Sequence, residues 1–506
     1  MILSRFTLKN VQKEGLIAPD EAIFDLPEKV LQFGTGVLLR GLPDYFIDKA
    51  NRQGIFNGRV VVVKSTSSGD SHAFDKQDSL YTLCVRGIEK GEKVEENIIS
   101  SSISRVLSAR DEWAEVLKCA RNPEMSIVIS NTTEVGIQLV HEDIRKHPPS
   151  SFPAKLLAFL YERYTAFKGS EASGMVIVPT ELIPDNGKKL EGIVLELAHL
   201  NGLEDKFIEW LESNNFFCNS LVDRIVPGKP AEAVLLQLTE ILGYTDDLLI
   251  MSEAYRLWAI EGNEHVQSVL SFAGADSGVI VAPDIDIYRE LKLRLLNGTH
   301  TLSCGLAFLA GFPTVRKSME DPAFTDFITK LMLAEIAEGI PYPLPGGKAR
   351  EFGLQVLDRF RNPHIEHQWI SITMQYASKM KTRNVPVLLR YYEVHGKIPV
   401  HMALGFAAFL LFMKAEKVVD GRFQGLHAGN PYPINDDKAA VFYELWKQHS
   451  PDELVDAVLR NEELWGADLS VLNGFPASVK EMLRLLTEEG ALNVLNKWKD
   501  MVSSDR

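Results

Sequence analysis

The sequence predicts an α/β N-terminal domain followed by a mainly α-helical C-terminal domain. In the first half, short β-branched runs alternate with helical segments, whereas amphipathic helices dominate and strands become rare after Pro283. A chain of 506 residues also exceeds what a single hydrophobic core usually holds. We therefore expect two domains, residues 1–284 and residues 285–506, the second of them all-helical.

The strands expected in the first half are short and mostly apolar. The run Arg59–Lys64 suits a strand that is buried on both faces, as in a parallel sheet with crossover helices. Two other runs, separated by the polar residues 89–92, predict a hairpin. The predicted strands are 30–33, 59–64, 81–87, 94 onward, 126–130, 175–179 and 279–281, with helices at 39–53 and 110–121.

A glycine-containing turn connects the first strand to the first helix. Gly34 permits a tight turn, Gly36 lets a ligand approach the backbone, and the start of the helix offers N–H groups to a phosphate, with Thr35 between the glycines. In this context the turn predicts a Rossmann-like domain that binds a dinucleotide. Leu39 stands where G-x-G-x-x-G has its third glycine, so an ordinary tight turn is the alternative.

Two further strand ends extend the predicted cofactor site. Asn131 and Thr132 follow the strand 126–130 at the edge where open α/β sheets bind ligands, and we expect them near the nicotinamide ribose. Lys64 ends the strand 59–64, where an acidic residue usually holds the adenosine ribose of NAD. Because no acidic residue stands there, NADP stays possible beside NAD.

The helix that opens the C-terminal domain carries Lys292, Asn297 and His300 among leucines, in the spacing K-x4-N-x2-H. In an α-helix the three would share one face, over an arc of about 140°, with Lys292 and His300 about 12 Å apart along the axis. A base, an amide and an imidazole that converge can handle a carbonyl or hydroxyl group, whereas the alternative is an ordinary polar stripe. The predicted helices are 287–308, 322–338, 366–379, 402–416, 438–449 and 479–499.

The composition limits the kinds of ligand and partner that the protein is expected to bind. The net charge of −14 argues against non-specific binding to nucleic acid. The four cysteines lack paired-ligand spacing, and His364 and His367 lack a third ligand, so neither a disulfide framework nor a metal site is expected. No apolar stretch is long enough to span a bilayer. We expect a cytoplasmic protein without a membrane segment, and its oligomeric state stays open.

The two motifs together resemble the signatures of the mannitol dehydrogenase, or long-chain polyol dehydrogenase, family. Gly34, Gly36 and Arg40 match G-x-G-x-x-x-R. Lys292, Asn297 and His300 match K-x4-N-x2-H. Other segments that carry the resemblance are 31–41, 122–125, 130–134, 181–183, 221–226, 296–301 and 359–363. The resemblance extends from about residue 28 to about residue 500.

The resemblance implies a metal-free oxidoreductase that uses NAD on CH–OH groups. It implies that Lys292 is the general acid/base, that Asn297 binds the developing oxyanion and that His300 positions the substrate, while Arg40 belongs to the cofactor site. These roles are chemically consistent, because hydride addition to a ketone leaves negative charge on the oxygen, which an amide stabilises and a proton donor neutralises.

Two departures from the mannitol-type pattern bear on the substrate. Leu182 stands where an asparagine assists the oxyanion, which leaves Asn297 as the main donor. Arg289 replaces a glutamate three residues before Lys292. Because arginine pairs with a carboxylate through two hydrogen bonds, this change favours a sugar acid, although a solvated surface charge is the alternative.

Four more residues are substrate-binding candidates: Asp223, Arg359, Arg361 and Lys379. For Asp223 a structural salt bridge is an equal alternative. Either Arg359 or Arg361 is expected to contact the substrate, and the alternative is that they cap a helix or form an ion pair. As a substrate-binding lysine, Lys379 is preferred over Lys381, and the alternative is that both belong to a solvated basic turn.

The resemblance implies reversible NAD(P)-dependent reduction of the sugar acid tagaturonate to altronate, a step of hexuronate catabolism. Fructuronate/mannonate reduction and polyol 2-dehydrogenation are the enzymatic alternatives. A sugar-acid-binding sensor is the non-enzymatic one. The intact lysine, asparagine and histidine argue against a sensor, because binding alone needs no proton donor.

Overall fold

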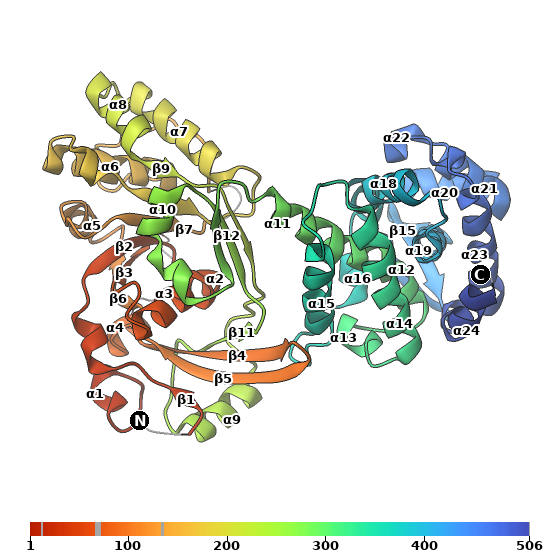
Figure 1. The fold of residues 1–506 in the computed structure, drawn as a ribbon, viewed down its shortest axis with the longest axis horizontal. Coiled ribbons are helices and arrows are strands. Elements are labelled where there is room, and N and C mark those ends of the chain that lie inside the picture. Colours follow the sequence, from red (N-terminus) through yellow and green to blue (C-terminus); the bar gives the residue numbers. More distant parts are fainter. Residues whose placement is uncertain (12–13, 66–71, 133–135, 505–506) are drawn as a thin grey trace. The chain divides into compact units, whose positions relative to one another are not determined.

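The structure is a computed structural model that describes residues 1–11, 14–65, 72–132 and 136–504 (Figure 1). The chain forms two compact units. The N-terminal unit comprises Met1–Gly87 and Lys93–Ile285, and the C-terminal unit comprises Ile88–Glu92 and Asp286–Arg506. The boundary expected from the sequence lay between residues 284 and 285.

The N-terminal unit is built on a six-stranded sheet in which all neighbouring strands are parallel. Its strands, in spatial order, are β6 (Ile103–Ser108), β3 (Arg59–Lys64), β2 (Glu28–Phe33), β7 (Ile127–Ser130), β8 (Val176–Pro179) and β9 (Phe216–Phe217). In chain order this is the 3-2-1-4-5-6 arrangement of the Rossmann fold, which confirms the predicted fold class. The order reverses between β2 and β7, and such a switch point is where open α/β sheets bind ligands.

Both faces of this sheet are buried, which explains the β-branched strands. On β3, Val60 and Val62 belong to an apolar cluster that includes α3, whereas Val61 and Val63 belong to a cluster that includes α6. The helices around the sheet are α2 (Val37–Gly41), α3 (Pro43–Arg52), α5 (Trp113–Cys119), α6 (Phe152–Phe167), α7 (Asn186–Leu200) and α8 (Asp205–Asn214) (Figure 1).

Two smaller sheets complete the N-terminal unit. The first orders β10 (Ser220–Asp223), β12 (Leu257–Glu261) and β13 (Val279–Ala282), and the second orders β1 (Leu16–Ile17), β5 (Glu92–Ser100), β4 (Tyr81–Glu89) and β11 (Ile250–Glu253). The predicted hairpin is β4–β5, and its two-residue turn has positive φ at both Lys90 and Gly91, as a type I′ turn requires. The other elements are α1 (Arg5–Leu8), η1 (Glu21–Asp25), α4 (His72–Lys76), η2 (Glu171–Ser173), α9 (Glu232–Leu242), α10 (Glu264–Val269) and η3 (Ser271–Ala275).

The C-terminal unit is mostly helical and is organised around α19 (Val400–Phe412), which is buried along nearly its whole length. This helix packs against α12 (Thr299–Leu309) and α23 (Phe475–Glu489). The other α-helices are α11 (Asp286–Leu291), α13 (Val315–Ser318), α14 (Pro322–Lys330), α15 (Lys348–Phe360), α16 (Trp369–Ile372), α17 (Tyr376–Lys379), α18 (Val385–His395), α20 (Ala439–Gln448), α21 (Pro451–Leu459), α22 (Glu462–Trp465) and α24 (Ala491–Ser504). Short 3₁₀ turns are η6 (Ala337–Gly339) and η8 (Leu469–Val471).

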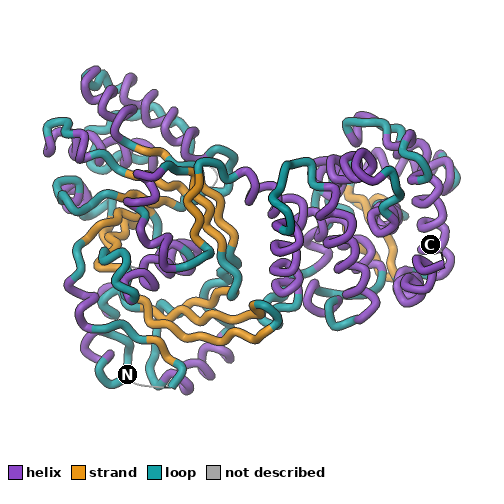
Figure 2. Tube along the Cα trace, in the orientation of Figure 1, coloured by secondary structure: helices purple, strands orange, loops and turns teal. Residues whose placement is uncertain are grey.

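The expectation of an all-helical C-terminal domain was wrong in one respect. Residues 417–433 form a three-stranded antiparallel sheet of β14 (Lys417–Val419), β15 (Arg422–His427) and β16 (Asn430–Pro433) (Figure 2). Asp420 and Gly421 both have positive φ, so the first turn is a type I′ hairpin turn. The strands are short and largely exposed, which removes the apolar alternation that would have revealed them, although the Asp-Gly pair was a readable signal.

Several predicted helices are interrupted. Residues 366–379 are not one helix, because Gln375 has a positive φ between α16 and α17, and Gly490 separates α23 from α24. The helix α15 was not predicted. Three segments are π-helical, namely η4 (Lys292–Gly298), η5 (Leu331–Ile336) and η7 (Met380–Asn384), and η4 holds two of the predicted catalytic residues.

Candidate active site

The predicted phosphate-binding turn lies at the switch point of the parallel sheet. Gly34 follows β2 with φ +126°, a conformation that L side chains rarely adopt. A Cβ at this position would lie 2.9 Å from Leu39 Cδ1 and 3.1 Å from the carbonyl oxygen of Asn131, which follows β7. The two strand ends therefore meet here, and Gly34 is required both by its conformation and by the close approach.

Gly36 differs from Gly34, because a Cβ on Gly36 would meet no protein atom within 4 Å. Gly36 is exposed and is the N-cap of α2, with Thr35 partly buried beside it. Open space over a glycine at the start of a helix fits the approach of a pyrophosphate to the backbone. The turn thus fits the phosphates of a dinucleotide.

Asn131 and Thr132 are held in place by the neighbouring strand end after β8. The Asn131 amide donates to the carbonyl and hydroxyl of Thr180, at 3.2 and 2.9 Å. The backbone N–H and the hydroxyl of Thr132 donate to Glu181 Oε1, at 2.8 and 3.0 Å. Glu181 is buried, and burial raises its pKa. The supporting role of Glu181 was not predicted, and residues 133 and 134 lie outside the described part of the chain.

Arg40 makes internal contacts. Its Nη1 donates to the Leu248 carbonyl at 2.6 Å, its guanidinium lies over the rings of Phe74 and Tyr81, and the residue is buried. This geometry gives Arg40 a structural function in the N-terminal unit, and cofactor binding by Arg40 stays a prediction. Lys64 is partly buried at the end of β3, where the sequence placed it.

A buried carboxyl group lies beneath the phosphate-binding turn. Gln32 donates to the Gly34 carbonyl at 3.4 Å and to Asp44 Oδ2 at 3.2 Å. Asp44 is fully buried, and this burial raises its pKa to about 7. The turn is therefore connected to a group that titrates near neutral pH.

The predicted catalytic residues lie on one continuous helix formed by α11, η4 and α12. Lys292 begins the π-helical segment and Asn297 lies five residues later, near its end. In a π-helix the i→i+5 hydrogen bond places residues five apart on one side, as the i→i+4 bond does for residues four apart in an α-helix. The π turn therefore aligns Lys292 with Asn297 more closely than the assumed α-helix would.

The backbone and the side chain of Asn297 have different surroundings. Its carbonyl accepts a hydrogen bond from the Thr301 hydroxyl at 2.7 Å and a long one from Arg383 Nη1 at 3.5 Å. Its side-chain amide, which is partly exposed, has no hydrogen-bond partner among the described residues. The amide is thus available to a ligand while the backbone behind it is held.

His300 has a ring fixed by aromatic neighbours. It stacks on Phe360 with ring centres 4.3 Å apart and contacts His367 and Trp369 edge-on at 5.3 and 5.9 Å. Its Nε2 is buried and is unpaired among the described residues. A fixed ring with an unpaired nitrogen suits a substrate hydroxyl, because a buried polar atom without a partner costs free energy.

Several basic side chains act electrostatically on His300. Burial and then the positive charges of His367, Arg359, Arg383 and Lys379 hold the pKa of His300 well below its ordinary value. Burial and Arg383 also lower the pKa of Lys379, whose Nζ donates to the Ile372 carbonyl at 3.0 Å. Positive charge is therefore concentrated at this part of the catalytic helix, although the whole chain carries a net charge of −14.

The remaining predicted substrate residues are placed differently. Arg289 forms an ion pair with Asp286 on its own helix. The Nη1 atom of Arg361 lies 3.8 Å from Oδ1 of Asp358, and the Arg361 side chain is 39% exposed. Asp223 is buried at the end of β10 in the N-terminal unit. Arg359 and Lys379, by contrast, act electrostatically on His300.

Sequence reasoning missed Arg383 and considered His367 only as a metal ligand. Both lie in irregular segments whose approach to His300 depends on tertiary packing, so no local signal indicated them. Within the described residues, no three His, Cys, Asp or Glu side chains are grouped so that they could hold a metal ion. In the same part of the chain, no helix is both long and apolar enough to cross a membrane.

Comparison with known proteins identifies the family. Residues 28–274 match the mannitol dehydrogenase Rossmann domain, and residues 284–487 match the mannitol dehydrogenase C-terminal domain. The chain belongs to the mannitol dehydrogenase family. As a member of this family it is an oxidoreductase acting on CH–OH groups, and its Rossmann domain supports a nicotinamide cofactor.

Relatives within the mannitol dehydrogenase family include altronate oxidoreductases. That of Bacillus subtilis (strain 168) is 39% identical over 477 residues, which cover 93% of this chain and 95% of the relative. Those of Halalkalibacterium halodurans and Shigella flexneri are 38% and 37% identical, over 92% of this chain and over 92% and 95% of their own lengths.

Two solved structures of dehydrogenases have the same fold. Mannitol 2-dehydrogenase of Pseudomonas fluorescens, in a ternary complex with NAD and D-mannitol, matches with a TM-score of 0.64 and 23% identity, over 99% of this chain and 100% of that one. A substrate-free D-sorbitol dehydrogenase matches with a TM-score of 0.75 and 20% identity, over 98% and 100%. At these identities the likeness establishes a Rossmann-like domain followed by a mostly helical domain.

Proposed function

We propose that this enzyme reduces the keto group of tagaturonate to give altronate, reversibly, with NAD as its cofactor, as a step of hexuronate catabolism in the cytoplasm. The observation that carries the proposal is the group of basic side chains at His300. A hexuronate bears a carboxylate and a simple ketose or polyol does not. The names of the altronate oxidoreductases, 37–39% identical to this chain, support the same substrate class.

The basic group can recognise a carboxylate in a way that a polyol site would not need. Arg359 and Arg383 offer guanidinium groups that bind carboxylates through two parallel hydrogen bonds, and Lys379 adds a point charge. In a protein of net negative charge, such a local concentration of cations offsets the repulsion of an anionic substrate. We therefore assign Arg359, Lys379 and Arg383 to the substrate carboxylate.

Each unit carries its own set of residues with a proposed role in the reaction. When bound, a nicotinamide cofactor supplies the hydride, and Gly34, Thr35, Gly36, Asn131 and Thr132 would hold it. As negative charge develops on the substrate oxygen, the unpaired amide of Asn297 donates a hydrogen bond to it. Lys292 transfers a proton to that oxygen in reduction and accepts it in oxidation. His300, fixed by its aromatic neighbours, orients a substrate hydroxyl.

The cofactor choice depends on the end of β3. Lys64 stands where an acidic side chain would bind the two ribose hydroxyls of NAD, and a lysine can accept the 2′-phosphate of NADP instead. We propose NAD as the main cofactor, and NADP is the alternative. Comparing NADH with NADPH under identical conditions decides between them.

A substrate panel tests the proposed function. Oxidation of NADH and of NADPH is followed with purified protein on tagaturonate, fructuronate and fructose. The expected result is the highest kcat/KM on tagaturonate, with fructose far lower than both keto acids. Higher activity on fructose than on either keto acid would contradict the sugar-acid assignment, and fructuronate above tagaturonate would favour the fructuronate/mannonate reaction.

A further inference from the structure

Two π-helical segments of the C-terminal unit hold each other in place. In η4, Arg294 Nη1 donates to the carbonyls of Thr382 and Arg383 in η7, at 2.7 and 2.9 Å. In the opposite direction, Asn384 Nδ2 at the end of η7 donates to the carbonyl of Gly298 at the end of η4, at 3.0 Å. Such donors are needed where a π turn meets an α-helix, because the hydrogen-bond ladder changes from i→i+5 to i→i+4 there.

The Asn384 contact lies directly behind Asn297. Gly298 follows Asn297, so the carbonyls of these consecutive residues are held by Thr301 and Asn384 respectively. The fit at Gly298 is close, since a Cβ there would lie 3.1 Å from Asn384 Nδ2. A side chain at Gly298 would therefore displace Asn384 slightly, whereas the φ of −65° is that of an ordinary helical residue.

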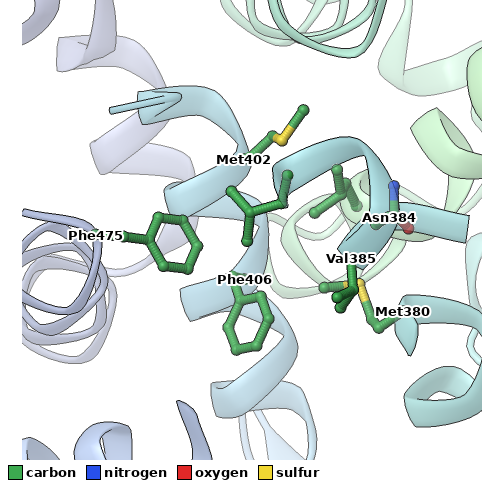
Figure 3. A pocket seen from close by; sticks show the side chains of 8 residues that line it. Met380, Asn384, Val385, Met402, Phe406 and Phe475 are labelled. Atoms are coloured by element: carbon green, nitrogen blue, oxygen red, sulfur yellow. The ribbon is translucent and has the colours of Figure 1, made fainter. Parts of the chain in front are cut away.

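Asn384 is poorly suited to its surroundings if it serves stability alone. It lines a small cavity whose other lining residues are apolar, namely Leu302, Met380, Val385, Leu388, Met402, Phe406 and Phe475 (Figure 3). Its Oδ1 is buried and has no hydrogen-bond partner among the described residues. An unpaired buried carbonyl oxygen costs free energy, because it loses its hydrogen bonds to water. An apolar side chain would avoid the unpaired oxygen but would also remove the donor to the Gly298 carbonyl, so this hydrogen bond is what the amide contributes here.

We propose that Asn384 is a positioning residue that sets the orientation of the Asn297 amide through the Gly298 carbonyl. Thr301 has the same function one residue earlier, through the Asn297 carbonyl. Together they fix the end of the π turn, so that the Asn297 side chain is ready to donate to the developing oxyanion without reorganising. This inference rests on the proposed catalytic role of Asn297.

The test compares Asn384→Ala and Thr301→Val with a matched control, Asn215→Ala. Asn215 is also a buried asparagine that holds helix-end carbonyls, those of Trp210 and Leu211, but it lies in the N-terminal unit. For both positioning variants we expect kcat to fall about tenfold, with the Kd for NADH changing less than twofold. The KM for tagaturonate should change less than twofold in Asn384→Ala, whereas it should also rise in Thr301→Val, because the Thr301 hydroxyl accepts a hydrogen bond from Arg383 Nη1 at 3.1 Å. Asn215→Ala should lower thermal stability by more than Asn384→Ala and leave kcat unchanged.

A double-mutant cycle with Asn297→Ala shows whether the two residues act through Asn297. In that background, adding Asn384→Ala or Thr301→Val should lower kcat no further, because the group that they position is gone. A full additional tenfold loss, or a normal kcat in both positioning variants, would overturn the inference and leave the proposed function intact. A normal kcat for Asn297→Ala would overturn the catalytic role itself and this inference with it.

Discussion

The two units carry their predicted functional residues in opposite ways. In the N-terminal unit, backbone groups at the ends of regular parallel strands form the cofactor-binding turn, and side chains such as Gln32 and Glu181 support that backbone from below. In the C-terminal unit, side chains on an irregular helix are expected to do the chemistry, and backbone carbonyls behind them are held by other side chains. The predicted phosphate site relies on backbone at a turn after a regular strand, whereas the predicted catalytic residues Lys292 and Asn297 lie on a π-helical departure from the α-helix.

The largest effect is expected in the C-terminal unit, when its proposed proton donor is removed. Lys292→Ala removes the proton donor, so kcat should fall by about 10²–10⁴-fold, the usual contribution of general acid–base catalysis. The Kd for NADH, measured by fluorescence titration, should stay within twofold, because the cofactor-binding turn belongs to the other unit. A turnover rate near that of the unaltered enzyme would exclude Lys292 as the proton donor.

The second prediction concerns the substrate carboxylate. Lys379→Met keeps the length of the side chain and removes its charge, so the KM for tagaturonate should rise about tenfold or more, as expected for one lost charge-assisted hydrogen bond. Lys381→Met is the matched control, since Lys381 is exposed and bonds to the Glu463 carbonyl, and its KM should not change. Equal KM values for the two variants would remove Lys379 from the substrate site.

The third prediction sharpens the difference between the two glycines of the phosphate-binding turn. Gly36→Ala adds a methyl group to open space, so folding stability should be kept while the Kd for NADH rises about tenfold, since the pyrophosphate can no longer approach as closely. Gly34→Ala should instead destabilise the fold, because of its φ and its contacts at 2.9 and 3.1 Å. Thermal unfolding and NADH titration of both variants separate the two effects, and loss of stability in Gly36→Ala would contradict this assignment.

The last prediction concerns folding stability rather than activity, and how that stability depends on pH. Because the pKa of Asp44 is raised to about 7 in the folded protein, the folded state retains a proton that the unfolded state releases near pH 4. Unfolding free energy should therefore decrease as pH rises from about 4 to about 7, by at most about 1.4 kcal/mol per pH unit for this one group. In Asp44→Asn this component should vanish, as measured by urea unfolding at several pH values. An unchanged slope would show that Asp44 is not protonated in the folded state.

Much of the architecture could be predicted because it depends on short, local sequence patterns. The β-branched runs, such as Arg59–Lys64, predicted the parallel sheet that the structure confirms, and the Gly34–Gly36 turn lies at the switch point of that sheet, where the cofactor is predicted to bind. The π turn at Lys292–Gly298 could not be predicted, because nothing in the spacing distinguishes it from an α-helix. Arg383 was missed for a related reason, since its approach to Thr301 depends on how η7 packs on α12.

The sequence by itself determined the fold class, the two-part organisation and the residue types available for catalysis, since these follow from hydrophobic periodicity and short motifs. Only the tertiary structure decided how those residues are used. It placed Arg40 in internal contacts, paired Arg289 with Asp286, gathered Arg359, Lys379 and Arg383 at His300, and set Asn384 behind Asn297. The physical reason is that charge recognition and the alignment of a π turn depend on contacts between segments distant in the chain, which no local spacing encodes.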